Sequence, residues 1–228
     1  MNFLALVLAL AACGTSSAPR PAGEGSGLYQ GREIAQTCSY LGADWLDRAE
    51  RAEREQPDKV VAALKLAPGT SAADVGAGTG YFTVRLARAV GPSGVVYATD
   101  LQPEMLRLLD ATLARERIAN VRIIRGTEHS AELPAACCDL VLLVDVYHEL
   151  SDPPGVMAGI RDALRPKGRL VLVEYRGEDP AVPIKPEHKM TLPRIQKELG
   201  GLGFRFVESL EFLPDQRIVV FTAEDRTR

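Results

Sequence analysis

The stretch ADVGAGTG, residues 73–80, decides the fold of this 228-residue chain. It joins a short apolar run at 71–75 to a segment that carries Phe82, Leu86 and Val90 at helical spacing. Glycines at such a junction let the backbone turn tightly and let a ligand approach the main chain closely. The stretch therefore predicts a strand, a ligand-binding turn and a helix in succession.

Strand-like and helical segments alternate beyond this unit. Further strands are expected at 95–99, 121–125, 140–144 and 169–174, helices at 79–90, 102–117, from 151 onward and at 191–200, and a final pair of strands at 204–213 and 217–223. The run at 140–144 is apolar throughout, as a strand buried on both faces should be. The alternation predicts the α/β class: a three-layer Rossmann-like sandwich around a mostly parallel seven-stranded sheet with a C-terminal antiparallel hairpin.

The N-terminal third divides into three segments ahead of a main domain at 67–228. Residues 1–12 contain an apolar run too short to span a bilayer but suited to a signal peptide. Residues 13–39 are rich in Gly, Ser and Pro over much of their length and predict a flexible tether. Residues 40–66 predict a helical cap segment, with helices at 43–55 and 58–66.

The end of the apolar run, Leu10-Ala11-Ala12-Cys13, resembles the lipobox of bacterial lipoproteins. That resemblance implies a lipid anchor at Cys13 and a domain facing the periplasm or the cell exterior. The alternative is a cytoplasmic protein with an apolar leader. The other cysteines, Cys38, Cys137 and Cys138, have no metal-ligand spacing, so free thiols and no metal site are expected.

The charge balance speaks against a nucleic-acid partner. The formal net charge is −3, and no run of Lys or Arg is longer than two. A protein held mainly by phosphate neutralisation would carry a basic excess. A small-molecule partner is expected instead, and nothing in the pattern indicates an oligomeric state.

Acidic residues stand at or near the ends of most predicted strands. In an open α/β sheet these ends form the ligand-binding edge. Five carboxylates would repel one another there unless a ligand with a cationic centre, an amine and ribose hydroxyls used them; they are Asp74, Asp100, Glu128, Asp145 and Glu174. A dinucleotide loop would need a third glycine where Tyr81 stands, so a nicotinamide-dependent oxidoreductase is the weaker interpretation.

Several segments, in the right order, resemble the motifs of class I S-adenosylmethionine-dependent methyltransferases. Residues 74–80 match D-x-G-x-G-x-G, and Asp100 follows Gly80 by 20 residues, as the acid of the second motif does. Residues 126–128, 138–149 and 164–170 resemble later parts of the family pattern. The resemblance implies S-adenosylmethionine as cofactor. The cofactor-binding residues it implies are Asp74, Gly76, Ala77, Gly78 and Gly80 for the methionine part, Asp100 with Leu101 for the ribose, Thr127 and Glu128 for the adenine, and Asp145 beyond the fourth strand.

The expected function is methyl transfer to a small-molecule acceptor. If the acceptor is a hydroxyl, thiol or acidic carbon, a base helps to remove its proton. His148 and Glu149, just past the fourth strand, are the candidate catalytic residues, and a structural role for His148 is the equal alternative. A non-catalytic domain that binds S-adenosylmethionine or S-adenosylhomocysteine on a membrane-anchored lipoprotein is the other interpretation.

Two regions are candidates for acceptor recognition. One is the segment with Tyr40, Trp45, Arg48 and Arg51, either as a lid or as a surface helix with Trp45 docked in the core. The other is the Pro-broken loop at 176–189, whose basic residues predict a substrate with a negative group; they are Lys185, His188 and Lys189.

Overall fold

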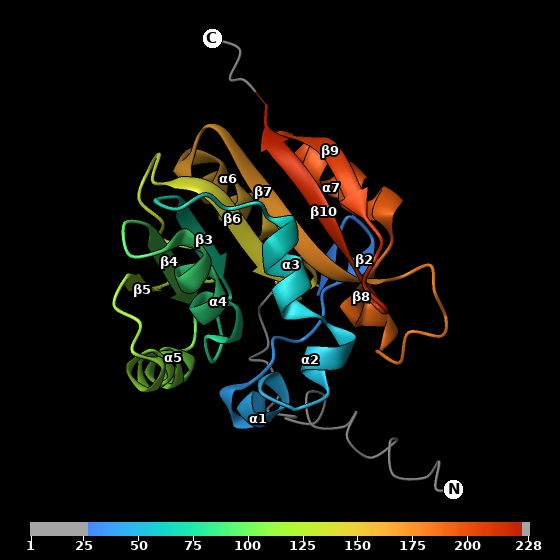
Figure 1. Cartoon of the computed structure of the whole chain (residues 1–228). Coiled ribbons are helices and arrows are strands. Elements are labelled where there is room, and N and C mark those ends of the chain that lie inside the picture. The colour runs from blue at the N-terminus through green and yellow to red at the C-terminus, as the bar shows by residue number, and fades with distance from the viewer. Residues whose placement is uncertain (1–26, 225–228) are drawn as a thin grey trace, which may run out of the picture.

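The computed structural model describes residues 27–224. A mixed β-sheet forms its centre (Figure 1). The strands run in the order β5-β4-β3-β6-β7-β10-β9, with a short β8 beside β7, so the described part of the chain forms an eight-stranded sheet. Only β10 runs antiparallel to its neighbours. The strands are β3 (Ser71–Val75), β4 (Val95–Asp100), β5 (Val121–Arg125), β6 (Cys138–Val144), β7 (Leu164–Arg176), β8 (Lys189–Met190), β9 (Phe204–Leu210) and β10 (Gln216–Ala223). The predicted fold class is confirmed, with β8 as an addition.

Helices cover both faces of the sheet. One face is covered by α3 (Pro57–Ala63), α4 (Tyr81–Val90) and α5 (Pro103–Glu116), and the other by α6 (Pro153–Ala163) and α7 (Leu192–Gly201). Both faces of the central strands are therefore buried, which accounts for their continuous apolar sequences.

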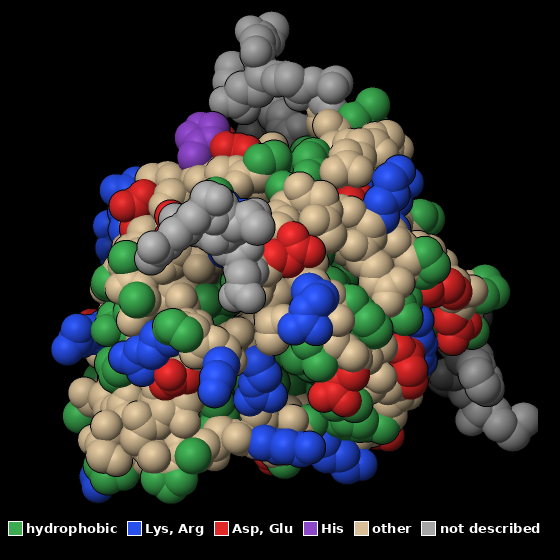
Figure 2. Space-filling model, turned by 90° about the horizontal axis from the view of Figure 1, so that it is seen from above, with side chains coloured by type: hydrophobic (Ala, Val, Ile, Leu, Met, Phe, Trp, Pro, Cys, Tyr) green, Lys and Arg blue, Asp and Glu red, His purple; other side chains and the backbone are tan. Residues whose placement is uncertain are grey.

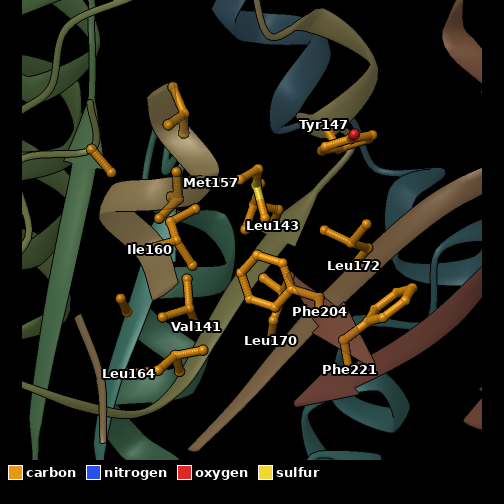
Figure 3. Close-up of a cluster of buried hydrophobic side chains, with 14 of the residues drawn as sticks. Val141, Leu143, Tyr147, Met157, Ile160, Leu164, Leu170, Leu172, Phe204 and Phe221 are labelled. Atoms are coloured by element: carbon orange, nitrogen blue, oxygen red, sulfur yellow. The ribbon is translucent and has the colours of Figure 1, made fainter. Parts of the chain in front are cut away.

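The alternation of side chains along β6 shows how one strand serves two cores. Leu140 and Leu142 pack under α3 and α4, whereas Val141 and Leu143 pack against α6. In the second core Met157 and Ile160 of α6 belong to the same buried cluster as Phe204 of β9 and Phe221 of β10 (Figure 3). Burial of these side chains is the main stabilising contribution, at about 1.5–3 kcal/mol for each large apolar group.

The helix expected at 43–55 is wrong as a single element. The chain forms a 3-10 turn η2 (Tyr40–Gly42), then α1 (Ala43–Leu46) and α2 (Arg51–Arg54). Arg48 donates to the Trp45 carbonyl at 2.7 Å and Arg51 donates to the Leu46 carbonyl at 2.5 Å. Because side chains satisfy these carbonyls, the helix ends there although the residues that follow favour helix.

The predicted tether at 13–39 is also incorrect for its last part. Residues 28–33 form a hairpin of β1 (Leu28–Tyr29) and β2 (Arg32–Glu33), turned by Gln30 and Gly31, which both have positive φ. Arg32 is buried and bonds Glu198 of α7 and the His148 carbonyl. Residues 1–26, including the predicted signal peptide and Cys13, lie outside the described residues.

Replacing Arg32 with alanine is expected to destabilise the protein by about 2 kcal/mol, because the buried Glu198 carboxylate loses one ion-pair partner. The loss is below the largest values for broken buried pairs because Glu198 still accepts from Tyr147 and Arg194. Urea denaturation would measure the free energy of unfolding. Glu33→Ala, at the neighbouring exposed position, is the control, and equal stability of both variants would contradict the prediction.

The described surface carries mixed charge. Figure 2 shows basic and acidic side chains interspersed on the face seen from above, in keeping with the small net charge. None of the helices described between residues 27 and 224 has the length and apolar composition needed to cross a bilayer. Cys38, Cys137 and Cys138 form no disulfide with one another.

Candidate active site

A cavity of about 940 Å³ lies where the parallel strands end. It has the size of a small-molecule binding site. Both candidate catalytic residues, His148 and Glu149, line the cavity. All the predicted cofactor-binding residues except Gly80 also line it: Asp74, Gly76, Ala77, Gly78, Asp100, Leu101, Thr127, Glu128 and Asp145. The topology therefore gathers residues from β3, β4, β6 and the loops after them into one site.

The glycine turn lines the cavity, and its backbone conformation disfavours residues with a side chain. Gly76 and Gly78 have φ values of 73° and 53°, and a Cβ at Gly76 would collide with Val146. Gly80 has a different role from its neighbours: it precedes α4 with φ 92°, and a Cβ there would meet Leu109 of α5 at 2.6 Å. Gly80 thus lets α5 pack closely, rather than lining the cavity.

Asp100 ends β4 with its carboxylate held by backbone amides. Its Oδ2 accepts from the Gly78 N–H at 3.0 Å, and its Oδ1 accepts from the Gln102 N–H at 2.9 Å. These bonds fix the carboxylate beside the glycine turn. Carboxylate oxygens have further lone pairs, so Asp100 can still accept from the two hydroxyls of a ribose. Burial raises its pKa, against the effect of those amide bonds.

Two further acids line the cavity: Asp74 is buried, and Asp145 is partly buried. Burial raises the pKa of Asp74 to about 6, while a hydrogen bond from Thr83 opposes that shift. Burial, with the charges of Glu55 and Glu174 nearby, raises the pKa of Asp145 well above its ordinary range. Asp145 has φ 54°, and its Oδ1 has no hydrogen-bond partner among the described residues. Strained backbone and an unpaired buried acceptor are typical of ligand-binding positions.

Asp74→Asn is expected to change how stability depends on pH. Since an unfolded Asp titrates near 3.9, the raised pKa favours the protonated group in the folded state. That contribution is complete below about pH 4 and is lost as the pH rises through about 6, at a total of roughly 2 to 3 kcal/mol. Urea denaturation at several pH values should therefore show the variant gaining stability relative to the wild type between pH 4 and 7.5. A constant difference would contradict the prediction.

Residues 34–46 cross the mouth of the cavity as a strap. The Ala35 N–H donates to the His148 carbonyl, and the Cys38 N–H donates to Glu149 at 3.3 Å. On the other side Gln102 donates to the Cys38 carbonyl at 2.8 Å and accepts from the Tyr40 N–H at 3.0 Å. The strap thus joins the end of β6 to the end of β4, and it begins ahead of the segment that the sequence offered as a lid.

The segment with the two arginines covers the cavity rather than forming a surface helix. Trp45 is half-buried against the Arg48 guanidinium at 3.8 Å, so it is not docked in the core. Arg48 and Arg51 both bond the buried Glu55, at 2.7 Å and 2.6 Å. Trp45, Arg48, Arg51 and Glu55 all line the cavity, which agrees with the lid interpretation.

His148 lines the same cavity and is held in a fixed orientation. It lies in the 3-10 turn η3 (Tyr147–Glu149), and its Nδ1 is 2.5 Å from Glu174 Oε2. Its Nε2 is 3.1 Å from Nδ1 of His188, a residue in η4 (Pro186–His188) after β7. Burial, followed by the nearby His148, lowers the pKa of His188 to about 4, so His188 is neutral at physiological pH.

The other basic residues of the loop differ in their surroundings. Lys185 lines the cavity, whereas the Lys189 ammonium donates to the carbonyls of Asp179 and Val182 within its own loop. Lys189 is therefore a structural residue of the loop, and Lys185 is the lysine placed to meet a negative group.

The cavity meets the requirements of S-adenosylmethionine. The glycine turn offers a close approach to the backbone, Asp100 offers a diol acceptor, and Asp74 and Asp145 place two further carboxyl groups in the cavity wall. The buried Oδ1 of Asp145, which has no hydrogen-bond partner among the described residues, is the observation that most directly indicates a polar ligand. Fold and site together have the features expected of a class I methyltransferase domain.

Comparison with known proteins agrees with this assignment. Residues 73–172 match the family model described as "Methyltransferase domain". "Demethylmenaquinone methyltransferase" of Geobacillus sp. (strain WCH70) is 31% identical over 111 residues, 49% of this chain and 47% of that protein. An "Uncharacterized 37.1 kDa protein in transposon TN4556" of Streptomyces fradiae is 35% identical over 141 residues, 62% of this chain and 39% of its own length. The chain spans about half the length of these curated relatives, or less.

A solved structure, "a SAM dependent methyltransferase from Aquifex aeolicus", superposes with a TM-score of 0.77 at 25% identity. The match covers 81% of this chain and 98% of that one. The chain therefore contains a methyltransferase domain whose cofactor is S-adenosylmethionine. The nicotinamide-dependent alternative receives no support from these relatives.

Two site residues acquired their importance only in the structure. Glu174 was one of the strand-end acids, but its position against His148 depends on the neighbouring strands β6 and β7. His188 stood out only as a basic loop residue. The hairpin ahead of the strap did have a signal, since Gln30-Gly31 between two short polar-apolar pairs favours a two-residue turn with positive φ.

Proposed function

We propose that this protein transfers the methyl group of S-adenosylmethionine to a small-molecule acceptor bound in the same cavity. The observation that carries the proposal is that two kinds of group line one cavity. The glycine turn and Asp100 line it, and so does His148, which is held by a buried carboxylate. Groups for a cofactor and groups for acid–base chemistry in one space are what methyl transfer to a protonated acceptor needs.

The predicted cofactor-binding residues would bind and orient the cofactor. Asp100 would accept from the ribose hydroxyls, the turn with Gly76 and Gly78 would hold the methionine part, and the Thr127–Glu128 turn would meet the adenine. When bound, S-adenosylmethionine supplies a methyl group already activated by its sulfonium. The strap and α1 would exclude water from the cavity.

His148 is the residue placed to receive the acceptor's proton. Its Nδ1 is held by Glu174, whose other oxygen accepts from the Tyr147 N–H at 3.0 Å, so the ring cannot turn freely. The carboxylate would stabilise the imidazolium that forms when Nε2 takes a proton. Glu149 lies beside it, with Oε1 3.9 Å from His148 Nε2.

The cavity walls favour an acceptor with an aromatic or apolar body. Trp45, Tyr175 and Ile184 line it, and Lys185 adds a cation near His188. The curated relatives named for demethylmenaquinone act on a quinone precursor, which supports a hydroquinone or phenol among the acceptors. A negative group on the acceptor would lie toward Lys185.

The test is to incubate the full chain with methyl-labelled S-adenosylmethionine and a panel of hydroquinones, phenols and thiols. We expect S-adenosylhomocysteine to form in an acceptor-dependent manner, with label in a product that mass spectrometry identifies. Cofactor binding without turnover across the panel would favour the non-catalytic binding domain instead. Absence of cofactor binding by the folded chain would contradict both.

We also propose that Cys13 carries a lipid, on the sole basis of the sequence Leu10-Ala11-Ala12-Cys13. Metabolic labelling of cells with a tagged fatty acid would test this modification. Label on the wild type that is lost in Cys13→Ala is expected. A wild type without label, or label that survives the substitution, would contradict the anchor and favour the cytoplasmic alternative.

A further inference from the structure

Three potential metal ligands from two separate segments converge on one wall of the cavity. His148 and Glu149 come from η3, and His188 comes from η4, 40 residues later in the chain. We propose that these three side chains bind a divalent transition-metal ion, for which zinc has the best match. The cysteine pattern in the sequence predicted no metal site, and this cluster contains no cysteine.

The distances between the ligand atoms fit a single ion. His148 Nε2 and His188 Nδ1 are 3.1 Å apart, and each lies 3.9 Å from the same oxygen, Glu149 Oε1. The point equidistant from these three atoms is about 2.1 Å from each, which is the usual length of Zn–N and Zn–O bonds. The three distances therefore allow all three atoms to bind one ion.

The surroundings of His148 match those of a metal-bound histidine. Metal ligands of this type usually give their second ring nitrogen to a carboxylate, which fixes the tautomer and orients the ring. Here Glu174 does so at 2.5 Å from Nδ1, and Glu174 is itself fully buried. Glu174 thus occupies Nδ1, and Nε2 faces His188 and Glu149.

The ligand set and its position indicate an open site. Two imidazoles and one carboxylate, with a remaining position for water or substrate, is a ligand set of catalytic zinc sites. All three side chains line the cavity, so the remaining position faces bound small molecules. Glu149 and Glu174 together supply two negative charges, which suit a divalent cation.

The consequence for catalysis rests on the proposed function, although metal binding itself does not. With an ion at Nε2, His148 no longer acts as a base. The ion would instead lower the pKa of an acceptor hydroxyl that occupies its open position. The competing explanation of the 3.1 Å contact is an ordinary hydrogen bond between two neutral imidazoles.

Titration calorimetry of the chelator-treated, untagged full chain with zinc chloride distinguishes a metal site from an ordinary hydrogen bond between the two histidines. We expect one ion per chain with micromolar or tighter affinity. His188→Gln and Glu149→Gln should each weaken binding at least about tenfold, and Glu174→Gln should weaken it about 10- to 100-fold through the orientation of His148. His129→Gln is the matched control, because His129 also lines the cavity but bonds Asp152 instead.

Cobalt(II) absorption gives a second readout that does not depend on activity. The cobalt-loaded chain should show visible bands of nitrogen and oxygen ligation that disappear in His188→Gln, while circular dichroism shows that the variant is folded. Zinc affinity unchanged in both His188→Gln and Glu149→Gln would overturn the proposal. So would a thiolate-to-cobalt band, which would assign the metal to Cys38 or another cysteine. Neither result would bear on S-adenosylmethionine binding, which is measured separately.

Discussion

Asp100→Ala is expected to weaken S-adenosylmethionine binding by about 100- to 1,000-fold, the largest change in cofactor affinity from any one substitution in the cavity. The carboxylate would accept from both ribose hydroxyls, and each hydrogen bond to a charged group contributes about 1.5–3 kcal/mol. Its position beside the cofactor is fixed by the Gly78 and Gln102 amides, so the bonds form without a prior rearrangement. Calorimetric titration of the full chain with S-adenosylmethionine and S-adenosylhomocysteine would measure the effect.

Two comparisons separate lost cofactor contacts from a damaged loop in this experiment. Asp110→Ala removes an exposed carboxylate from α5 and should leave the affinity unchanged. Asp100→Asn keeps the size of the side chain and one acceptor oxygen, so it should lie between the wild type and the alanine variant. Equal affinity of Asp100→Ala and the wild type would contradict the ribose assignment.

His148→Gln is expected to lower kcat by about 100- to 10,000-fold with the first acceptor that the panel identifies. The reason is that Nε2 either accepts the acceptor's proton or holds the ion that acidifies it, and glutamine does neither well. S-adenosylmethionine affinity should stay close to that of the wild type, because the His148 side chain bonds Glu174 and His188 and makes no contact with Asp100 or its amide donors. Steady-state kinetics would measure kcat, and calorimetry on the same preparation would measure the affinity for S-adenosylmethionine.

The control for His148 is again His129→Gln, which should retain the wild-type kcat. A His148 variant that keeps full activity would contradict both roles and would make His148 a structural residue. A loss of cofactor binding together with kcat would indicate that the substitution disturbs the strap, since the His148 carbonyl accepts from Arg32 and from the Ala35 N–H.

The sequence by itself determined the layered α/β core and the predicted cofactor-binding part of the cavity. These depend on local patterns: apolar runs such as 140–144 need burial on both faces, and the turn with Gly76 and Gly78 needs positive φ. Parallel strands place their carboxyl ends on one edge, so Asp74, Asp100 and Asp145 had to lie near one another. Helix propensity, in contrast, misjudged residues 43–55, because Arg48 and Arg51 bond the carbonyls that a longer helix would have used.

Only the tertiary structure decided the rest of the site. Glu174 meets His148 because β6 and β7 are adjacent in register, and His188 reaches the same point because the loop after β7 folds back along the cavity. The strap at 34–46 joins Glu149 to Gln102 across a separation in sequence that no local pattern encodes. Contacts of this kind depend on how distant segments pack, and their energies come from burial and paired polar groups rather than from the local preferences of the residues.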